Sequence, residues 1–175
     1  MNTKLRAFLG GLIGPQPLYF AGVLITAVFL FVGVFSAVHE LSHAAAAAAV
    51  DIRVKEIHLT GLSGFSRPFN AFGVRWFADA HDYAWVGVDY AGVDLHSFRA
   101  GLVYAAGPFA DAIGAVFFFL AWRRRWVVKF FFVRLSLFLA IILAIAVIVN
   151  LAPSYDKQGN PRSDGAKLLL VVRRG

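Results

Sequence analysis

Three long apolar stretches dominate the pattern of hydrophobic and polar residues along the chain. Residues 18–48 carry no charged side chain before Glu40, and residues 101–122 and 130–151 carry one each, Asp111 and Arg134. A helix needs about 20 mainly apolar residues to cross the hydrocarbon core of a bilayer. We therefore predict membrane-spanning helices over approximately these three ranges.

The first apolar stretch is longer than a bilayer requires, because it continues to residue 50. Residues 18–50 would extend about 50 Å as a helix at 1.5 Å per residue, whereas the hydrocarbon core is about 30 Å thick. We expect this helix to tilt, to protrude from the bilayer or to be broken near its start.

Residues 51–100 follow a different pattern, in which apolar and polar residues alternate between many glycines, as in IRVKEIHLTG and YAWVGVDYAGVDL. Alternation with a period of two indicates short strands. We expect a small strand-rich or re-entrant segment here, between the first and second spans. After the third span a polar insert leads to a short apolar run, and Asp164 is placed to cap a helix that begins near Ala166.

Composition agrees with one integral membrane domain of mainly α class over residues 1–175. The chain is 59% hydrophobic, above the roughly 45–50% of soluble domains. It has no cysteine, which excludes disulfides and thiolate metal ligands. The net charge is +7, but the basic residues cluster beside apolar runs, as in residues 123–125. This placement is typical of anchoring to lipid headgroups, so we expect the bilayer and not nucleic acid as a partner.

The motif HELSH stands inside the first apolar stretch, where ionisable groups are costly and usually functional. His39 and His43 are four residues apart and share one face of a helix, so both can bind one metal ion. Catalytic zinc usually has three protein ligands and one open position. Glu40, beside the first histidine, can take a proton from water activated at the zinc.

The third ligand cannot be assigned from spacing alone. The secreted zinc proteases that continue the motif as HxxGxxH are excluded, because Ala46 and Ala49 stand at the glycine and histidine positions. Glu56, in a strand-like stretch, is a poor candidate for a ligand on a following helix. The candidates that remain are Asp164, Asp156, His58, His81, His96 and Asp111.

Taken in order, several motifs resemble the site-2 protease family of intramembrane zinc metalloproteases. They are VHELSHAAAA in the first span, AGPFAD at residues 106–111, NLAP at residues 150–153 and SDG at residues 163–165. The resemblance covers approximately residues 30–170, so it implies a minimal three-helix metalloprotease core with one zinc ion per chain.

The resemblance also implies residue roles. His39, His43 and Asp164 would bind zinc, Glu40 would act as general base, and Asn150 would hold the substrate strand or the developing oxyanion. The substrate would be a transmembrane protein, cut in or near its membrane segment. The protein would lie in the cell membrane with its site nearer the cytoplasmic face.

The positions of the motifs along the chain, taken without the resemblance, also place the two histidines and Asp164 on the same side of the membrane. His39 lies 21 residues after Leu18, toward the end of its span that leads into residues 51–100. Three spans bring the tail that carries Asp164 to that same side. An extended substrate could pair with a strand edge supplied by the segment IRVKEIHLTGLSGFSR, which includes His58.

Two departures from the family pattern affect the site. Asp164 follows Asn150 by 14 residues, across a polar insert that contains the competing Asp156, although the glycine and apolar run after Asp164 favour it. Asp111 stands where the family has asparagine, and it could hydrogen-bond within the bundle, bind an ion or pair with an arginine.

Two other functions compete with proteolysis. The same scaffold could bind a metal or a peptide without cleaving it, but a pure binder has no need of Glu40. Alternatively, His39, Glu40, Asp111 and His43 could form an ion or proton pathway. That function would need no zinc and would leave the Asp-Gly tail unexplained.

Overall fold

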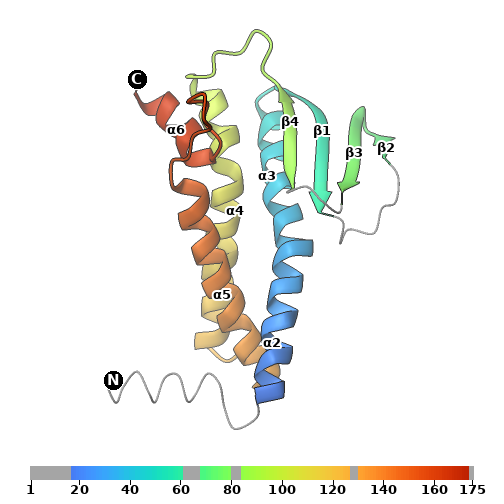
Figure 1. The fold of residues 1–175 in the computed structure, drawn as a ribbon, viewed down its shortest axis with the longest axis vertical. Helices are drawn as coiled ribbons and strands as arrows, with labels where there is room; N and C mark the ends of the chain where they lie inside the picture. Colours follow the sequence, from blue (N-terminus) through green and yellow to red (C-terminus); the bar gives the residue numbers. More distant parts are fainter. Residues whose placement is uncertain (1–16, 61–67, 80–83, 127–129, 174–175) are drawn as a thin grey trace.

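Three helical columns stand side by side, and a small sheet flanks one of them (Figure 1). The computed structural model describes residues 17–60, 68–79, 84–126 and 130–173. The first column contains α2 (Pro17–Leu30), η1 (Phe31–Phe35) and α3 (Ser36–Ala49); the others are α4 (Phe98–Arg123) and α5 (Phe130–Leu151). Residues 18–49, 98–123 and 131–151 are each long and apolar enough to cross a membrane. The prediction of a mainly α chain with three helices long and apolar enough to cross a membrane is confirmed.

The first column is not broken near its start; its irregularity lies in the middle, at the π-helical segment η1. The backbone N–H of Ser36 donates to the carbonyl of Phe31, five residues earlier, instead of four as in an α-helix. The Ser36 hydroxyl donates to the carbonyl of Val32 in the same turn. The column therefore runs on as one helix, with a locally wider turn before the HELSH motif.

Four strands form the predicted sheet: β1 (Arg53–Thr60), β2 (Phe69–Ala71), β3 (Val74–Asp79) and β4 (Trp85–Asp89). Their order is β2-β3-β1-β4, with β1 parallel to β3 and antiparallel to β4. The expectation that the segment of β1 supplies a free edge is wrong, because β1 is paired on both sides. Among the described strands, the edge nearest the helices belongs to β4.

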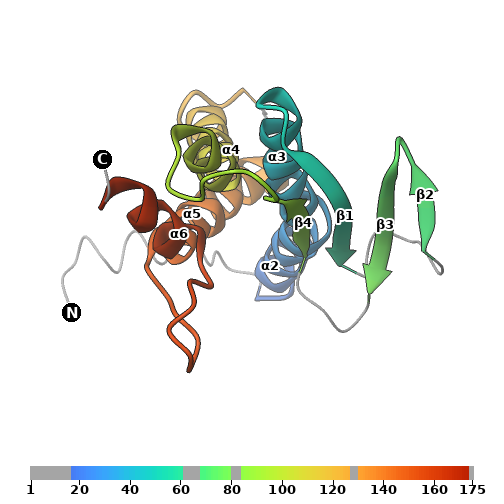
Figure 2. The same cartoon turned by 90° about the horizontal axis from the view of Figure 1, so that it is seen from above.

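Two apolar cores connect these elements. Val23 and Ala27 of α2 pack against Leu135 and Leu139 of α5. A second core joins the end of α3 to the start of α4 and to the sheet, through Ala47, Ile52, Val103, Val54 and Val88. The sheet therefore lies against α3 and projects away from α4, α5 and α6, as the view from above shows (Figure 2).

The short helix α6 (Asp164–Val172) returns to the bundle at the end where α3 stops, α4 begins and α5 stops, which we call the sheet end (Figure 1). The N-cap of α6 is Ser163, whose Oγ accepts the backbone N–H of Ala166, so the expectation that Asp164 caps this helix is wrong. Gly165 lies directly against the backbone of Leu151, where an added Cβ would collide with the carbonyl. This close approach brings Asp164 over the helix bundle.

Candidate metal centre

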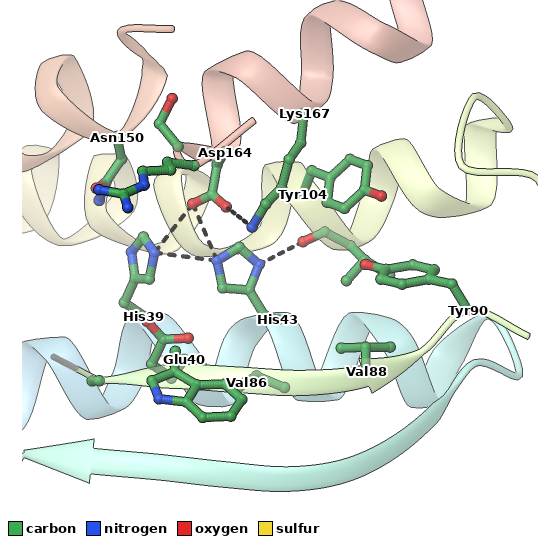
Figure 3. Close-up of a pocket in the computed structure, with 15 residues that line it drawn as sticks. His39, Glu40, His43, Val86, Val88, Tyr90, Tyr104, Asn150, Asp164 and Lys167 are labelled. Atoms are coloured by element: carbon green, nitrogen blue, oxygen red, sulfur yellow. Dashed lines mark hydrogen bonds and ion pairs between the residues drawn. The ribbon is translucent and has the colours of Figure 1, made fainter. Parts of the chain in front are cut away.

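Three side chains that could ligate a metal ion meet between α3 and α6. The Nε2 atoms of His39 and His43 are 3.2 Å apart, and Oδ2 of Asp164 lies 3.4 Å from the first and 3.3 Å from the second. Both histidines are buried. Figure 3 shows the two imidazoles rising from α3 toward Asp164. The structure thus brings together the three residues named above as ligands, whereas Asp156 lies elsewhere, in the exposed insert.

The donor set and its spacing fit a small cation. Ligand atoms placed about 2.0–2.1 Å from a tetrahedral ion are separated from one another by about 3.3 Å, close to the three distances in this cluster. Two imidazole nitrogens and one carboxylate oxygen leave the fourth position of such an ion open. His39, His43 and Asp164 could therefore hold one divalent cation.

Each histidine uses its other nitrogen to fix the direction of its ring. Nδ1 of His39 donates to Oδ2 of Asp111 at 2.8 Å, and Nδ1 of His43 donates to the carbonyl of Val103 at 2.6 Å. With the proton on Nδ1, each Nε2 presents a lone pair to the centre. Two such lone pairs facing a carboxylate oxygen repel one another unless a cation or a proton lies between them, which is why the arrangement favours a metal ion.

The close approach of α4 to the two imidazoles depends on Gly107. A Cβ on this residue would collide with Nε2 of both His39 and His43. Pro108, which follows it inside the helix, lacks an N–H and so cannot donate the helical hydrogen bond to the carbonyl four residues earlier. The Gly-Pro pair noted in the sequence therefore gives the backbone of α4 room beside the imidazole pair.

Asp164 is held by a second contact, from its own helix. Nζ of Lys167, one turn later, lies 3.7 Å from Oδ1, the carboxylate oxygen that does not face the histidines. Burial alone would raise the pKa of Asp164, but its contacts with His39 and His43 and the nearby charge of Lys167 outweigh burial and hold the pKa below its usual range. The carboxylate is therefore ionised at neutral pH, as a metal ligand must be.

The structure shows which partners Asp111 has, a question that the sequence left open. Besides His39, its Oδ2 accepts Nδ2 of Asn150 at 3.3 Å, and the carboxylate is buried. Its role within the described residues is thus hydrogen bonding inside the bundle, with no arginine partner. Asn150 is connected through Asp111 to His39, while its predicted contact with a substrate stays a prediction.

Two cavities meet at the cluster. The first, of about 240 Å³, lies toward the sheet end and is lined by His43, Tyr90, Tyr104, Arg162 and Lys167 among others. The second, of about 370 Å³, lies toward the middle of the helices; its exposed surface is mainly apolar and includes Phe31, Val32 and Phe35 of η1, although half of its ten lining residues are polar. His39, Glu40, Ala84 and Asn150 line both cavities. The candidate metal centre thus lies where the second cavity, called the apolar cavity below, meets the first, called the polar cavity.

Glu40 and the edge of β4 form one wall of the polar cavity. Glu40 is half-buried and lies between His39 and β4 (Figure 3). Val86 and Val88 of β4 line the same cavity. Because β4 pairs only with β1 among the described strands, the backbone groups along its other edge can hydrogen-bond an extended chain laid beside the metal centre.

The remaining candidate ligands lie elsewhere or have other partners. His58 stacks between Phe77 and Trp85 in the sheet, with ring centroids 4.2 and 3.8 Å away, so it is a packing residue and not merely a surface one. Nδ1 of His96 donates to the carbonyl of Leu170 at 2.8 Å and ties α6 to the loop before α4. His81 lies outside the described residues.

Several residues of the site were not expected from the sequence. They are Val103, Tyr90, Tyr104, Arg162 and Lys167. Lys167 had a readable signal, since residues three apart on a helix share a face and Lys167 follows Asp164 by three. The others reach the site only through the packing of α4, β4 and the insert, which no local pattern reveals.

Comparisons of the chain with protein-family models, with curated proteins and with solved structures find no match.

Proposed function

We propose that the protein is an intramembrane zinc endopeptidase of the site-2 protease type. In this proposal His39, His43 and Asp164 hold one zinc ion, and Glu40 is the general base. The substrate is the membrane-spanning segment of another protein, cut near the cytoplasmic face of the cell membrane. One observation carries the proposal: three donor atoms 3.2–3.4 Å apart lie beside a half-buried glutamate, between an apolar and a polar cavity.

The chemistry divides between the ion and the side chains around it. When bound, zinc would polarise the scissile carbonyl and make water a sufficient nucleophile at neutral pH. Glu40 accepts the proton of the attacking water and passes it to the leaving amine. Asp111 holds His39 in the tautomer that presents Nε2, and the Val103 carbonyl does the same for His43.

The surroundings suit a peptide that comes from a bilayer. A transmembrane helix has its carbonyls hydrogen-bonded internally, so it must unwind before a bond can be cut. The edge of β4 that pairs with no described strand offers replacement hydrogen bonds to the unwound segment. The apolar cavity beside η1 would take side chains that are still in the hydrocarbon, while water reaches the polar cavity from the sheet end.

The test compares Glu40→Gln with the wild-type protein, both purified and reconstituted in lipid nanodiscs. Zinc content is measured by mass spectrometry, and cleavage is measured on a panel of single-span reporter proteins. We expect about one zinc per chain in both proteins, and cleavage by the wild type alone, because glutamine cannot accept the proton. Asp164→Asn, which removes a ligand, should lose both the metal and the cleavage.

Equal cleavage by Glu40→Gln and the wild type would exclude Glu40 as the general base. Zinc-loaded wild-type protein that cleaves none of the reporters would instead favour a non-proteolytic binding function.

A further inference from the structure

The apolar cavity follows the helices away from the candidate metal centre toward the middle of the bundle. Phe31, Phe35 and His39 of the first column all line it and are spaced four residues apart. On α5 it is lined by Ala146 and by Asn150, which is four residues later and so on the same face of the helix. Both columns run toward the sheet end (Figure 1). The far part of the cavity thus lies one to two helical turns, about 5–11 Å, deeper than His39 and Asn150.

This cavity offers few free hydrogen-bonding groups to an occupant. Four of its five polar side chains already hydrogen-bond within the described part of the chain. The Ser36 hydroxyl donates to a backbone carbonyl of its own helix, and the Asp111 carboxylate accepts from His39 and Asn150. The fifth, Glu40, lies at the metal end and is the proposed general base. A polar side chain placed in the far part would leave its hydrogen-bonding groups unpaired, which is costly, whereas an apolar side chain would not.

An aromatic ring and a small residue set the size of the cavity. The ring of Phe35 packs edge-to-face against Phe118 of α4, with ring centroids 5.5 Å apart, which restrains its position. On α5, Ala146 projects only a methyl group toward the cavity. The cavity measures about 370 Å³, whereas a cavity of about 150 Å³ is sufficient to bind benzene. There is therefore room for a phenyl ring or a leucine side chain beside Phe35 and Ala146.

We propose that this protein selects substrates with a large apolar side chain, such as phenylalanine or leucine, close to the cleaved bond on its membrane-embedded side, and that Ala146 sets the upper limit on its size. This inference rests on the proposed function and names its substrate class. An extended chain advances about 3.3 Å per residue. A cavity that begins about one helical turn from the ligands would thus receive the side chain of the first or second residue beyond the bond. Phe35 and Ala146 act as specificity residues, because they contact that side chain and not the reacting atoms.

Binding of short peptidyl hydroxamates tests this inference separately from cleavage. The hydroxamate group chelates zinc and so fixes the compound relative to the cavity. Two series carry Ala, Leu or Phe, one at the first residue beyond the chelating group and one at the second. Their dissociation constants are measured by calorimetry on zinc-loaded wild-type protein in nanodiscs. In one series we expect the Leu and Phe compounds to bind about 10- to 100-fold more tightly than the Ala compound, because even one methylene group in an apolar pocket changes binding by about tenfold or more.

Filling the cavity supplies the decisive comparison. Ala146→Phe should weaken binding of the Leu and Phe compounds to the level of the Ala compound, whose own affinity should change little. Ala146→Leu makes the same comparison with a smaller side chain and should weaken the Phe compound more than the Leu compound. Ala144→Phe, at an exposed position of the same helix outside the lining of this cavity, is the matched control and should keep the wild-type ranking. Zinc content and melting temperature are measured for every variant, so that loss of the metal or of the fold is recognised.

Equal affinity for the Ala, Leu and Phe compounds in both series, which is the result expected if a lipid chain fills the cavity, would overturn the inference. So would no measurable binding of any compound, or an unchanged ranking in both Ala146 variants. Cleavage of reporters regardless of the side chains beside the bond would overturn the inference and leave the proposed function standing. A size-dependent ranking in a protein that cleaves no reporter would support the apolar subsite and overturn the proposed function.

Discussion

Gly107→Ala is the sharpest single test of the metal centre, because it adds one carbon atom and removes no ligand. In an ordinary helix position this change stabilises a protein by up to about 1 kcal/mol. Here the new Cβ would lie 2.5 Å from Nε2 and 2.6 Å from Cε1 of His39, and it would also meet Nε2 of His43. We therefore expect Gly107→Ala to weaken metal binding, although the same change at an ordinary helix position would stabilise the protein.

The magnitude follows from how far the imidazoles must move. An ordinary contact with a Cβ begins at 3.4 Å, so the His39 ring must retreat by about 0.9 Å, whereas metal–ligand distances tolerate deviations of only about 0.2 Å. The buried packing of Val103 and Ala47 opposes separation of α3 from α4. We expect metal affinity to fall by about 100-fold or more, which is about 3 kcal/mol.

The assay is zinc content after purification, followed by competition with a chromogenic chelator. Gly22→Ala is the matched control, because an added Cβ there meets no atom within 4 Å, and it should keep wild-type affinity. The melting temperature of the wild type should fall when zinc is removed, while that of Gly107→Ala should not respond. If Gly107→Ala bound one zinc ion with wild-type affinity, the two Nε2 atoms could not share an ion at this position.

Four further substitutions probe the proposed metal ligands and the residues around them. Asp164→Asn should lose zinc and Asp156→Asn should keep it, as measured by metal content; the reverse result would assign the third ligand to the insert. Asp111→Asn should fold normally, by thermal melting, yet weaken zinc about 10- to 100-fold in chelator competition, because His39 loses a charged partner; unchanged affinity would limit Asp111 to packing. Gly165→Ala should reduce the free energy of unfolding by about 1–3 kcal/mol in denaturant titration and also lose zinc, since its Cβ collides with the Leu151 backbone; wild-type stability would show that α6 can shift freely.

Local patterns were sufficient to predict the helices and the paired histidines. The apolar stretches predicted three spans within a few residues of their observed ends, and spacing alone brought His39 and His43 onto one face. Asp164 was different, because its distance from Asn150 departs from the family pattern. The approach of Asp164 to the two histidines depends on how Gly165 packs against Leu151, and that contact follows from tertiary structure.

The features that escaped prediction depend on contacts between distant parts of the chain. Asp111 was recognisable as a costly charge in a span, but its partner His39 is 72 residues away and no periodicity connects them. Alternation predicted strands in residues 51–100, yet it carried no information about their order, which leaves β4 at the edge instead of β1. The π-helical segment has no signature in the letters FVGVF, because a wider turn depends on what packs around it.

That wider turn makes the orientation of the HELSH motif depend on a residue count within the hydrocarbon. Before η1 the first column packs against α5, and after η1 it packs against α4 and the sheet. Each residue added to or removed from a helix rotates everything beyond it by about 100°. A one-residue insertion between Phe31 and Phe35, where the turn already holds one residue more than an α-turn, would therefore rotate both imidazoles away from Asp164 while leaving every candidate ligand in the chain. The rotational phase of this helix is thus as important to the centre as the ligand atoms themselves.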